Sequence, residues 1–479
     1  MSWIFPKNLV PEAVDHQVLL LVIAGLIAFF AVCRCLARLR RNQRVDLFHP
    51  LIFPTAYVAI ATLGPALWIY GKRSNLGYIT SDQLSERTAL LLALAVIGFV
   101  IGAAVPFERR AQVVSAIDRA TLTQIGRVLL LFPLTMALID LSQNTVLTRG
   151  QNQAEITAAD SLGSGALIVA PAAVLLILSG RMRKPRLIGA VDWALIGTTV
   201  IVSGLNGRRA GAIAIMLVVI MFVAARGFAG IRLALGLGTV VVFTNTILEY
   251  RTTAVGEVVE LSFVESALRD LGSVAFTTGL TDRLQTSHLY GATLIDSLIR
   301  QLPSPIAIPL FGPPTGTGNV RFRDLAGSNS DNGYGFSVPA EGVMNFGILG
   351  AFILPFVVGL TLAWLYARSD LTGARPIGWV YSIAVAALPF SWRSDMLGTV
   401  KGLLYPFILF TLAVILSRTV YKPGSTDLLG GLSTCERENA RLVRENWTYH
   451  SSHLPEKKGI PYVSGWVGAG GSEQVRRLM

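Results

Sequence analysis

The chain has 479 residues, of which 52% are hydrophobic and 15% are charged, and its mean hydropathy is +0.56. This composition excludes an ordinary soluble protein. Many stretches of about 18 or more apolar residues are each long enough to cross a bilayer core of about 30 Å, so we expect a polytopic membrane protein. The formal net charge of +12 does not indicate nucleic-acid binding, because lysine and arginine gather in the cytoplasmic loops of membrane proteins.

The pattern predicts an all-α fold of about eleven transmembrane helices. These spans lie near residues 17–37, 51–70, 88–106, 126–143, 163–180, 190–204, 210–225, 232–248, 341–367, 377–391 and 398–417. The chain then divides into eight helices (1–248), a large loop (249–340), three helices (341–421) and a polar tail (422–479) without a core of its own. The first 16 residues lack a basic region and a cleavage site, so we expect the first span to be the targeting signal.

The charges of the loops predict the orientation. Basic residues crowd "CRCLARLRRNQR", "ERRAQVVSAIDRA" and "RMRKPR", and Arg226 and Arg368 lie in two further short loops. By the count of spans, all of these loops fall on one side, which the positive-inside rule makes the cytoplasm. The N-terminus is then outside and the tail inside. We expect a bacterial cytoplasmic membrane protein with the segment 249–340 on its outer face.

Arginines also gather on the predicted outer face, where the positive-inside rule does not require them. Arginine near a bilayer is costly, at about 2.5–3.5 kcal/mol in mid-membrane, so this group suggests an anionic ligand. Alternatively, their side chains reach lipid phosphates. The arginines are Arg149, Arg208, Arg209, Arg251, Arg283, Arg300 and Arg393.

The outer segment has contrasting parts. "SALRDLGSVAFTTGLTDRL" has the spacing of an amphipathic helix. "PSPIAIPLFGPP" is expected to be non-helical, because proline lacks a donor and restricts the residue before it. The segment therefore predicts short interfacial helices followed by a proline-fixed lid.

A helix is predicted from residue 337 to residue 367, with Ser337 as N-cap and Pro339 in its first turn. Such a helix is about 45 Å long and exceeds the bilayer core, so its first turns stand above the membrane or it breaks near Gly347. Glu341 and Asn345 are four residues apart and share a face. Helix packing is expected at Gly347, Gly350 and Gly359.

Several motifs together resemble a known family. "TDRLQTSHLYGATLIDSLIRQLPSPI", "SVPAEGVMNFGILGAFILPFVVG", the turn "GLNGRR" and the late "FSWRSD" resemble, in order and spacing, the Wzy-type polymerases of O-antigen and capsular polysaccharide. The resemblance covers roughly residues 48–417. One departure is "LPSPIAIPLFGPP", which lacks the basic residues that the family carries there.

The resemblance implies an enzyme similar to membrane-embedded glycosyltransferases of the C type. It implies transfer of a growing glycan from undecaprenyl diphosphate to a new lipid-linked repeat unit on the outer leaflet, producing O-antigen, capsule or exopolysaccharide. A chain-length regulator and a flippase are partners by family analogy. No cofactor is expected. The absence of an Asp-x-Asp and of a Walker motif predicts no metal-bridged sugar nucleotide and no ATP site.

The residues fit this chemistry. Arginine presents a fork that matches phosphate, and an acceptor hydroxyl needs a base. The candidate bases are Glu341 and Asp282. The candidate ligands of diphosphate and sugar are Arg208, Arg209, Arg251, Arg283, Arg300, Asn345, Arg393 and Tyr290.

Structural alternatives stay open for several of these residues. Glu341 could serve only the dipole of its helix. Asp282 and Arg283 could form a solvated pair. Tyr290 could be an interfacial aromatic residue, and His288 a hydrogen-bonded surface histidine.

Two other functions remain open. One is an O-antigen ligase, which shares the fold and the donor. The other is a polysaccharide or lipid transporter, which usually has ionisable residues in mid-membrane and internal repeats. The first eight spans are almost free of internal charge, which favours an enzyme. The cysteines, Cys33, Cys35 and Cys435, have neither metal-ligand spacing nor a disulfide pattern.

Overall fold

The computed structural model describes most of the chain between residues 16 and 420. The described ranges are 16–41, 46–72, 84–108, 119–143, 158–180, 189–205, 209–225, 263–285, 287–302, 304–312, 316–326, 336–369 and 376–420, with scattered positions between 236 and 246. All regular secondary structure in these ranges is helical.

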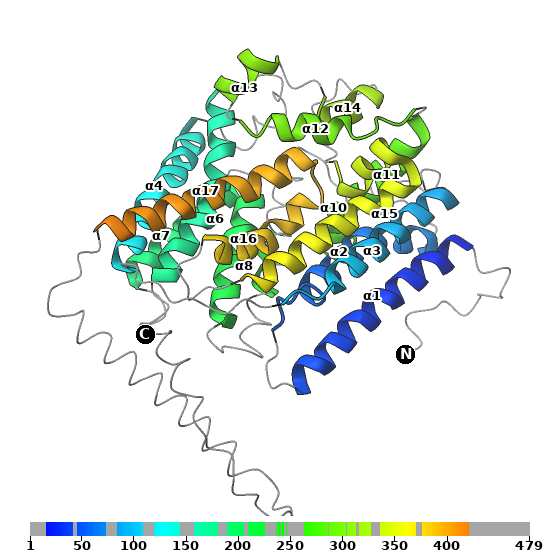
Figure 1. Cartoon of the computed structure of the whole chain (residues 1–479), viewed down its shortest axis with the longest axis horizontal. Helices are drawn as coiled ribbons and strands as arrows, with labels where there is room; N and C mark the ends of the chain where they lie inside the picture. The colour runs from blue at the N-terminus through cyan, green and yellow to red at the C-terminus, as the bar shows by residue number, and fades with distance from the viewer. Residues whose placement is uncertain are drawn as a thin grey trace, which may run out of the picture. The chain divides into compact units, whose positions relative to one another are not determined.

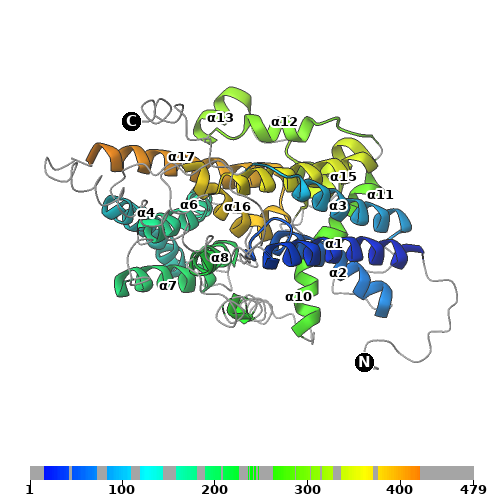
Figure 2. The same ribbon diagram turned by 60° about the horizontal axis from the view of Figure 1, so that its bottom comes forward.

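The long and medium helices are α1 (His16–Arg41), α2 (Phe53–Lys72), α3 (Glu86–Ala104), α4 (Arg119–Gln143), α6 (Ala158–Gly180), α7 (Ala190–Leu205), α8 (Arg209–Ala225), α15 (Val338–Ala367), α16 (Pro376–Ser391) and α17 (Met396–Val420). The short helices are α10 (Phe263–Leu271), α11 (Ser273–Leu284), α12 (Ala292–Ile299), α13 (Ser304–Phe311) and α14 (Gly318–Leu325). Figures 1 and 2 both place α12 and α13 outside the long helices, on one side of them.

The helices agree with a polytopic membrane protein. Ten of the eleven predicted spans coincide with described helices. Among the described residues, six helices are long and apolar enough to cross a membrane: His16–Leu39, Phe53–Gly71, Glu86–Ala104, Arg119–Ile139, Val338–Ala367 and Met396–Thr419. The predicted span 232–248 is described only at scattered helical positions, and the tail 422–479 lies outside the described residues.

Large apolar side chains remain exposed along the outward faces of the long helices. On α1, Phe29 and Phe30 are each 67% exposed, and α4 exposes Val128 to the same extent. A soluble monomer rarely exposes such continuous apolar surface. These faces are suited to contact with lipid.

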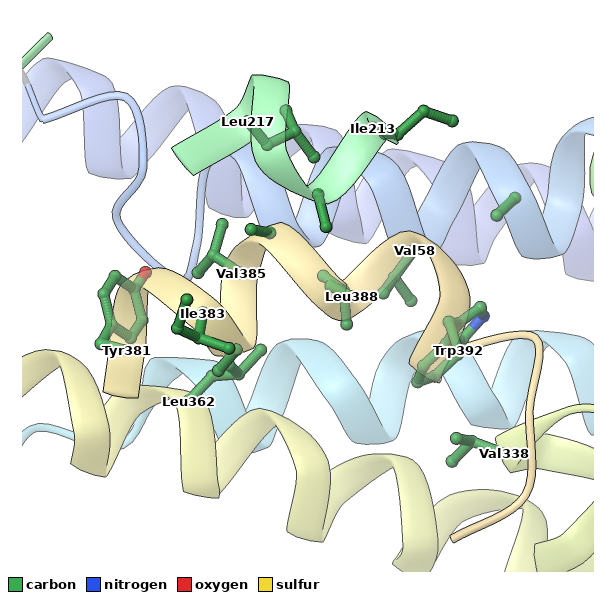
Figure 3. Packing of buried hydrophobic residues seen from close by; sticks show 14 of the residues in the cluster. Val58, Ile213, Leu217, Val338, Leu362, Tyr381, Ile383, Val385, Leu388 and Trp392 are labelled. Carbon is green, nitrogen blue, oxygen red and sulfur yellow. The ribbon is translucent and has the colours of Figure 1, made fainter. Parts of the chain in front are cut away.

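The packing forms two groups of helices that α16 and α17 connect. In one group α3 packs against α1, α2 and α15, and in the other α4 packs against α6 and α7. Helix α8 packs against α6 and α7 and so belongs to the second group; α16 contacts α8 from this group and α15 from the first. Figure 3 shows this position, with Leu217 on one side of Val385 and Leu362 near Ile383. The core therefore runs through α16.

Helices α3 and α15 touch through their backbones. A Cβ atom added at Gly102 would lie 2.1 Å from the carbonyl oxygen of Phe356, and one added at Gly359 would lie 2.3 Å from that of Phe99. Only glycine allows two helices to approach so closely. The expectation of a packing position at Gly359 is confirmed.

A buried ion pair joins α4 and α7. The Arg127 Nε atom lies 2.7 Å from Asp192 Oδ1, and the Asp192 side chain has no exposed surface. The expectation that the first eight spans are almost free of internal charge missed this pair. Its partners are 65 residues apart, and hydropathy alone cannot reveal such pairing.

Two expectations about the outer segment need correction. The stretch that was expected to be non-helical contains α13, in which Pro309 is internal. Pro305 lies in the first turn, where a missing N–H costs nothing, and the helix is only 8 residues long. The stretch predicted as an amphipathic helix forms two helices, α10 and α11, and the residues of α11 from Ser273 to Gly279 are buried within the protein.

A polar cluster where α15 begins

A sharp turn at Gly347 divides α15. Gly347 has φ 62° and ψ −139°, a conformation that side chains other than glycine disfavour. A Cβ atom there would also lie 2.7 Å from the His288 ring. The two parts fold closely, since a Cβ atom at Gly350 would lie 1.8 Å from the Gly342 carbonyl oxygen. The predicted break is confirmed, and α15 is not one straight helix of about 45 Å.

The break frees backbone carbonyls that a preceding loop occupies. The Met344 carbonyl accepts a hydrogen bond from the Leu289 N–H at 3.1 Å and another from the Gln285 side-chain amide. The Asn345 carbonyl accepts one from the Tyr290 N–H at 2.9 Å. Such carbonyls lack a partner within the helix. The loop between α11 and α12 is therefore docked on the break.

Glu341 lies just before this break and is fully buried. Its Oε1 atom accepts a hydrogen bond from the Thr293 hydroxyl at 2.8 Å, and its Oε2 atom accepts one from the Met396 N–H at 2.7 Å. The Asn345 amide nitrogen donates to Thr293 Oγ1 at 2.7 Å and to the Glu341 backbone carbonyl at 2.8 Å. We call Thr293, Glu341, Asn345 and the Met396 N–H the polar cluster.

The N-terminal ends of several helices meet at the Glu341 carboxyl group. Thr293 is in the first turn of α12, and Met396 is the first residue of α17. Gly318 begins α14, and a Cβ atom there would lie 3.0 Å from Glu341 Cδ. Helix N-termini carry partial positive charge. The carboxyl group thus joins α12 and α17 to the start of α15 by hydrogen bonds, and the first residue of α14 lies close to it.

Further polar contacts fix this end of the protein. The Ser337 hydroxyl, which caps α15, lies 2.9 Å from the Thr277 hydroxyl of α11. The Arg393 Nε atom donates to the Ser273 hydroxyl at 2.9 Å. Asp395 caps α17 by accepting from the Gly398 N–H at 3.1 Å. Segments that are far apart in the sequence therefore interlock around the polar cluster.

Asp282, the second candidate base, lies at the end of α11 and pairs with α3. Its Oδ1 atom is 2.9 Å from the Arg87 Nε atom; the Asp282 side chain is 7% exposed and the Arg87 side chain 61%. Burial raises the pKa of Asp282, and the positive charge of Arg87 offsets part of that rise. Asp282 therefore forms an ion pair with Arg87 of α3.

The other predicted ligands occupy different environments. Arg300 is buried; its Nε atom lies 3.1 Å from both carboxylate oxygens of Asp296, and its NH1 atom donates to the Gly312 carbonyl at 2.7 Å. Arg283 is exposed at the end of α11. Tyr290 is 81% exposed and has a φ of 46°, close to the His288 ring. Arg300 thus serves the local structure, whereas Arg283 and Tyr290 face outward.

Three of the predicted ligands cannot be placed. Arg208 and Arg251 lie outside the described residues, and Arg209 begins α8 with a side chain that is not described. Among the described residues, no group of three or more His, Cys, Asp and Glu side chains could hold a metal ion. The described part of the site therefore consists of carboxyl, hydroxyl, amide and guanidinium groups.

The sequence indicated Glu341 and Asn345 but not Thr293, which connects them. Thr293 is 48 residues from Glu341 and belongs to no pattern of its own. Ser273 and Thr277 were hidden in the same way, within a stretch that was read only for its helical spacing. Hydroxyl groups of this kind become visible only when the helices are packed.

These features define a helical, membrane-embedded protein with a buried polar cluster where several helices begin. Comparisons with protein-family models, curated proteins and solved structures find no match for this chain.

Proposed function

We propose that the chain is a glycosyltransferase that polymerises oligosaccharide repeat units linked to undecaprenyl diphosphate, as its resemblance to the Wzy-type polymerases implies. The observation that supports this most directly is the interlocking of the resembling motifs. The motif around Tyr290 bonds to the one around Asn345, and Thr293 bonds to Glu341. Separate parts of the chain thus build one polar region at the start of α15.

In the proposed reaction, a hydroxyl oxygen of the incoming repeat unit attacks the anomeric carbon of the donor glycan. The bond between that carbon and the diphosphate oxygen breaks, and the prenyl diphosphate leaves with the electron pair. The hydroxyl proton passes to a carboxylate. Guanidinium groups such as those of Arg283 and Arg393 stabilise the departing anion, because charge that develops in the transition state is best met by preorganised cations.

The geometry favours Asp282 over Glu341 as the carboxylate that accepts this proton. A base must come within about 2.6–3.2 Å of the hydroxyl, whereas both oxygens of Glu341 are occupied and the side chain has no exposed surface. Asp282 retains some exposed surface, and its partner Arg87 is largely exposed. We therefore assign proton transfer to Asp282 and positioning of the helices to Glu341.

The proposal places the polar cluster on the outer face of the bacterial cytoplasmic membrane. At the opposite end of the protein, the helix ends that are predicted to face the cytoplasm contact each other. The Tyr366 hydroxyl near the end of α15 donates to Asp46 at 2.8 Å, and Arg119 at the start of α4 donates to the Ser179 carbonyl at 2.9 Å. That this end faces the cytoplasm follows from the loop charges.

The test compares surface polysaccharide from cells with and without the gene. We expect the wild-type strain to make long chains and the deletion strain to accumulate lipid carrying one repeat unit. Free polymer that is still made but no longer attached would instead indicate a ligase. Repeat units that remain on the cytoplasmic side would indicate a transporter, and unchanged chain lengths would overturn the proposal.

A further inference from the structure

A large groove lies at the opposite end of α15 from the polar cluster. It has a volume of about 1460 Å³ and is lined by α1, by the residues that end α3 and by the last turns of α15. Ile23, Leu26, Ile27 and Phe30 of α1 form one apolar wall, and Ala363 and Ala367 of α15 contribute to the other. The volume exceeds the roughly 300–1,000 Å³ of typical pockets for small ligands.

Two arginines lie at one end of this groove. Arg34 and Arg38 both line it, and they are four residues apart on α1, so they share a face. Phe30 precedes Arg34 by one turn on the same face. The groove therefore changes along α1 from a purely apolar stripe to a pair of exposed guanidinium groups.

The nearby carboxylate is already occupied. Asp46 accepts hydrogen bonds from the Tyr366 hydroxyl at 2.8 Å and from the Phe48 N–H at 3.0 Å. Within the described ranges, no salt bridge joins Arg34 or Arg38 to a carboxylate. Since guanidinium groups match phosphate oxygens well, this end of the groove is suited to a phosphate group.

We propose that this groove binds a diacyl phospholipid with an anionic headgroup. Its phosphate contacts Arg34 and Arg38, and its acyl chains lie along Ile23, Ile27 and Phe30. Three observations carry the assignment: the size of the groove, its apolar wall, and the arginine pair where that wall ends. The site is separate from the proposed glycan chemistry, which involves the other end of α15.

Native mass spectrometry of the purified full-length protein tests the proposal. The delipidated protein is titrated with dioleoyl phosphatidylglycerol and, separately, with dioleoyl phosphatidylcholine, which has the same chains but no net charge. We expect tighter binding of phosphatidylglycerol. Replacing both arginines (Arg34→Gln with Arg38→Gln) should weaken it about 30-fold, because each basic residue near an anionic lipid contributes about fivefold.

The matched control replaces two exposed arginines of α14, Arg321→Gln with Arg323→Gln, and should change phosphatidylglycerol binding less than twofold. Equal loss in both double variants would overturn the site. Equal binding of the two lipids by the wild-type protein would overturn the role of the charge.

Two further titrations use unchanged protein and so do not depend on the folding of any variant. Dihexanoyl phosphatidylglycerol has the same headgroup with short chains, and we expect it to bind much more weakly. Inorganic phosphate should not displace the long-chain lipid. If the short-chain lipid or phosphate competes fully, the groove recognises a free anion and the lipid assignment fails.

Discussion

If Glu341 positions helices and takes no part in proton transfer, its replacement should change the stability of the protein by an amount that the hydrogen bonds predict. Glutamate offers two acceptor oxygens, and both are in use, toward Thr293 and Met396. In the Glu341→Gln variant, the single amide oxygen must face the Met396 N–H, and the amide NH₂ then faces Thr293. The amide can donate to Thr293 Oγ1, but the Thr293 hydroxyl proton loses its buried acceptor, which should lower the free energy of unfolding by about 1–3 kcal/mol.

Thr293→Val is the matched control. It keeps the carboxyl group and removes both the hydrogen bond to Glu341 and the one that Asn345 donates to Thr293 Oγ1, so its loss of stability should be at least about 1–3 kcal/mol. If Glu341 only positions the helices, the polymerisation rates of the Glu341→Gln and Thr293→Val variants should lie within about tenfold of each other. Asp282→Asn should instead lower turnover by about 10²–10⁴-fold with little change in stability, since its partner Arg87 is largely exposed.

The assay pairs thermal unfolding in detergent with the glycan ladder made from purified lipid-linked repeat units. A Glu341→Gln protein that is as stable as wild type but inactive, beside an active Asp282→Asn protein, would refute the reasoning and make Glu341 the base. A pH arm adds a second check. A base works when deprotonated, so activity should rise with pH through the raised pKa of Asp282. Arg87→Gln removes a stabilising charge and should shift that rise to higher pH, whereas the neighbouring Glu86→Gln should not.

Other predictions concern the fold and the orientation. Asp192→Ala leaves the half-buried Arg127 without its carboxylate and should cost about 1–3 kcal/mol of stability, part of which Arg127→Met in the same protein should restore; equal stability of the single and double variants in thermal unfolding would contradict this. Gly347→Ala should lower the free energy of unfolding by about 1–3 kcal/mol, because alanine disfavours the backbone conformation at this position. A variant as stable as wild type would contradict the argument from backbone strain. In single-cysteine proteins, Arg321→Cys should react with a membrane-impermeant thiol reagent in intact cells and Arg183→Cys, in a loop that the charges predict to be cytoplasmic, only after permeabilisation; the reverse pattern would invert the orientation.

The long helices were predictable because a bilayer imposes a local rule. A span must contain enough consecutive apolar residues to cross the hydrocarbon core, and this can be counted along the sequence. The same rule limited the helix from 337 to 367 to two alternatives, a first part that stands above the membrane or a break near Gly347, and the structure has the break. Helix α13 was missed because two prolines argued against it locally, although one of them occupies a first turn, where proline is tolerated.

The environment of Glu341 could not be predicted from its neighbours in the sequence. A carboxylate in a first helical turn usually faces water and favours the helix dipole. Here Thr293 comes from 48 residues before Glu341, and the Met396 N–H from 55 residues after it. Whether the carboxyl group contacts a substrate or is enclosed depends on how those elements pack. The periodicity of the sequence carries no information about this packing.

The two ends of α15 have different mechanical roles because its two parts are held differently. Beyond the break, the backbones of α15 and α3 touch at Gly102 and Gly359, so these helices cannot shift without losing direct contact. Before the break, buried apolar side chains such as Val343 and the close contact of Gly342 with Gly350 also hold the chain, and hydrogen bonds from Thr293, Leu289 and Met396 add to this packing. Hydrogen bonds exchange partners at little net cost when another polar group replaces them. Movement at this end of α15 is therefore expected first in the loop between α11 and α12, whose hydrogen bonds to the Met344 and Asn345 carbonyls can be exchanged, while the α3–α15 pair stays in place.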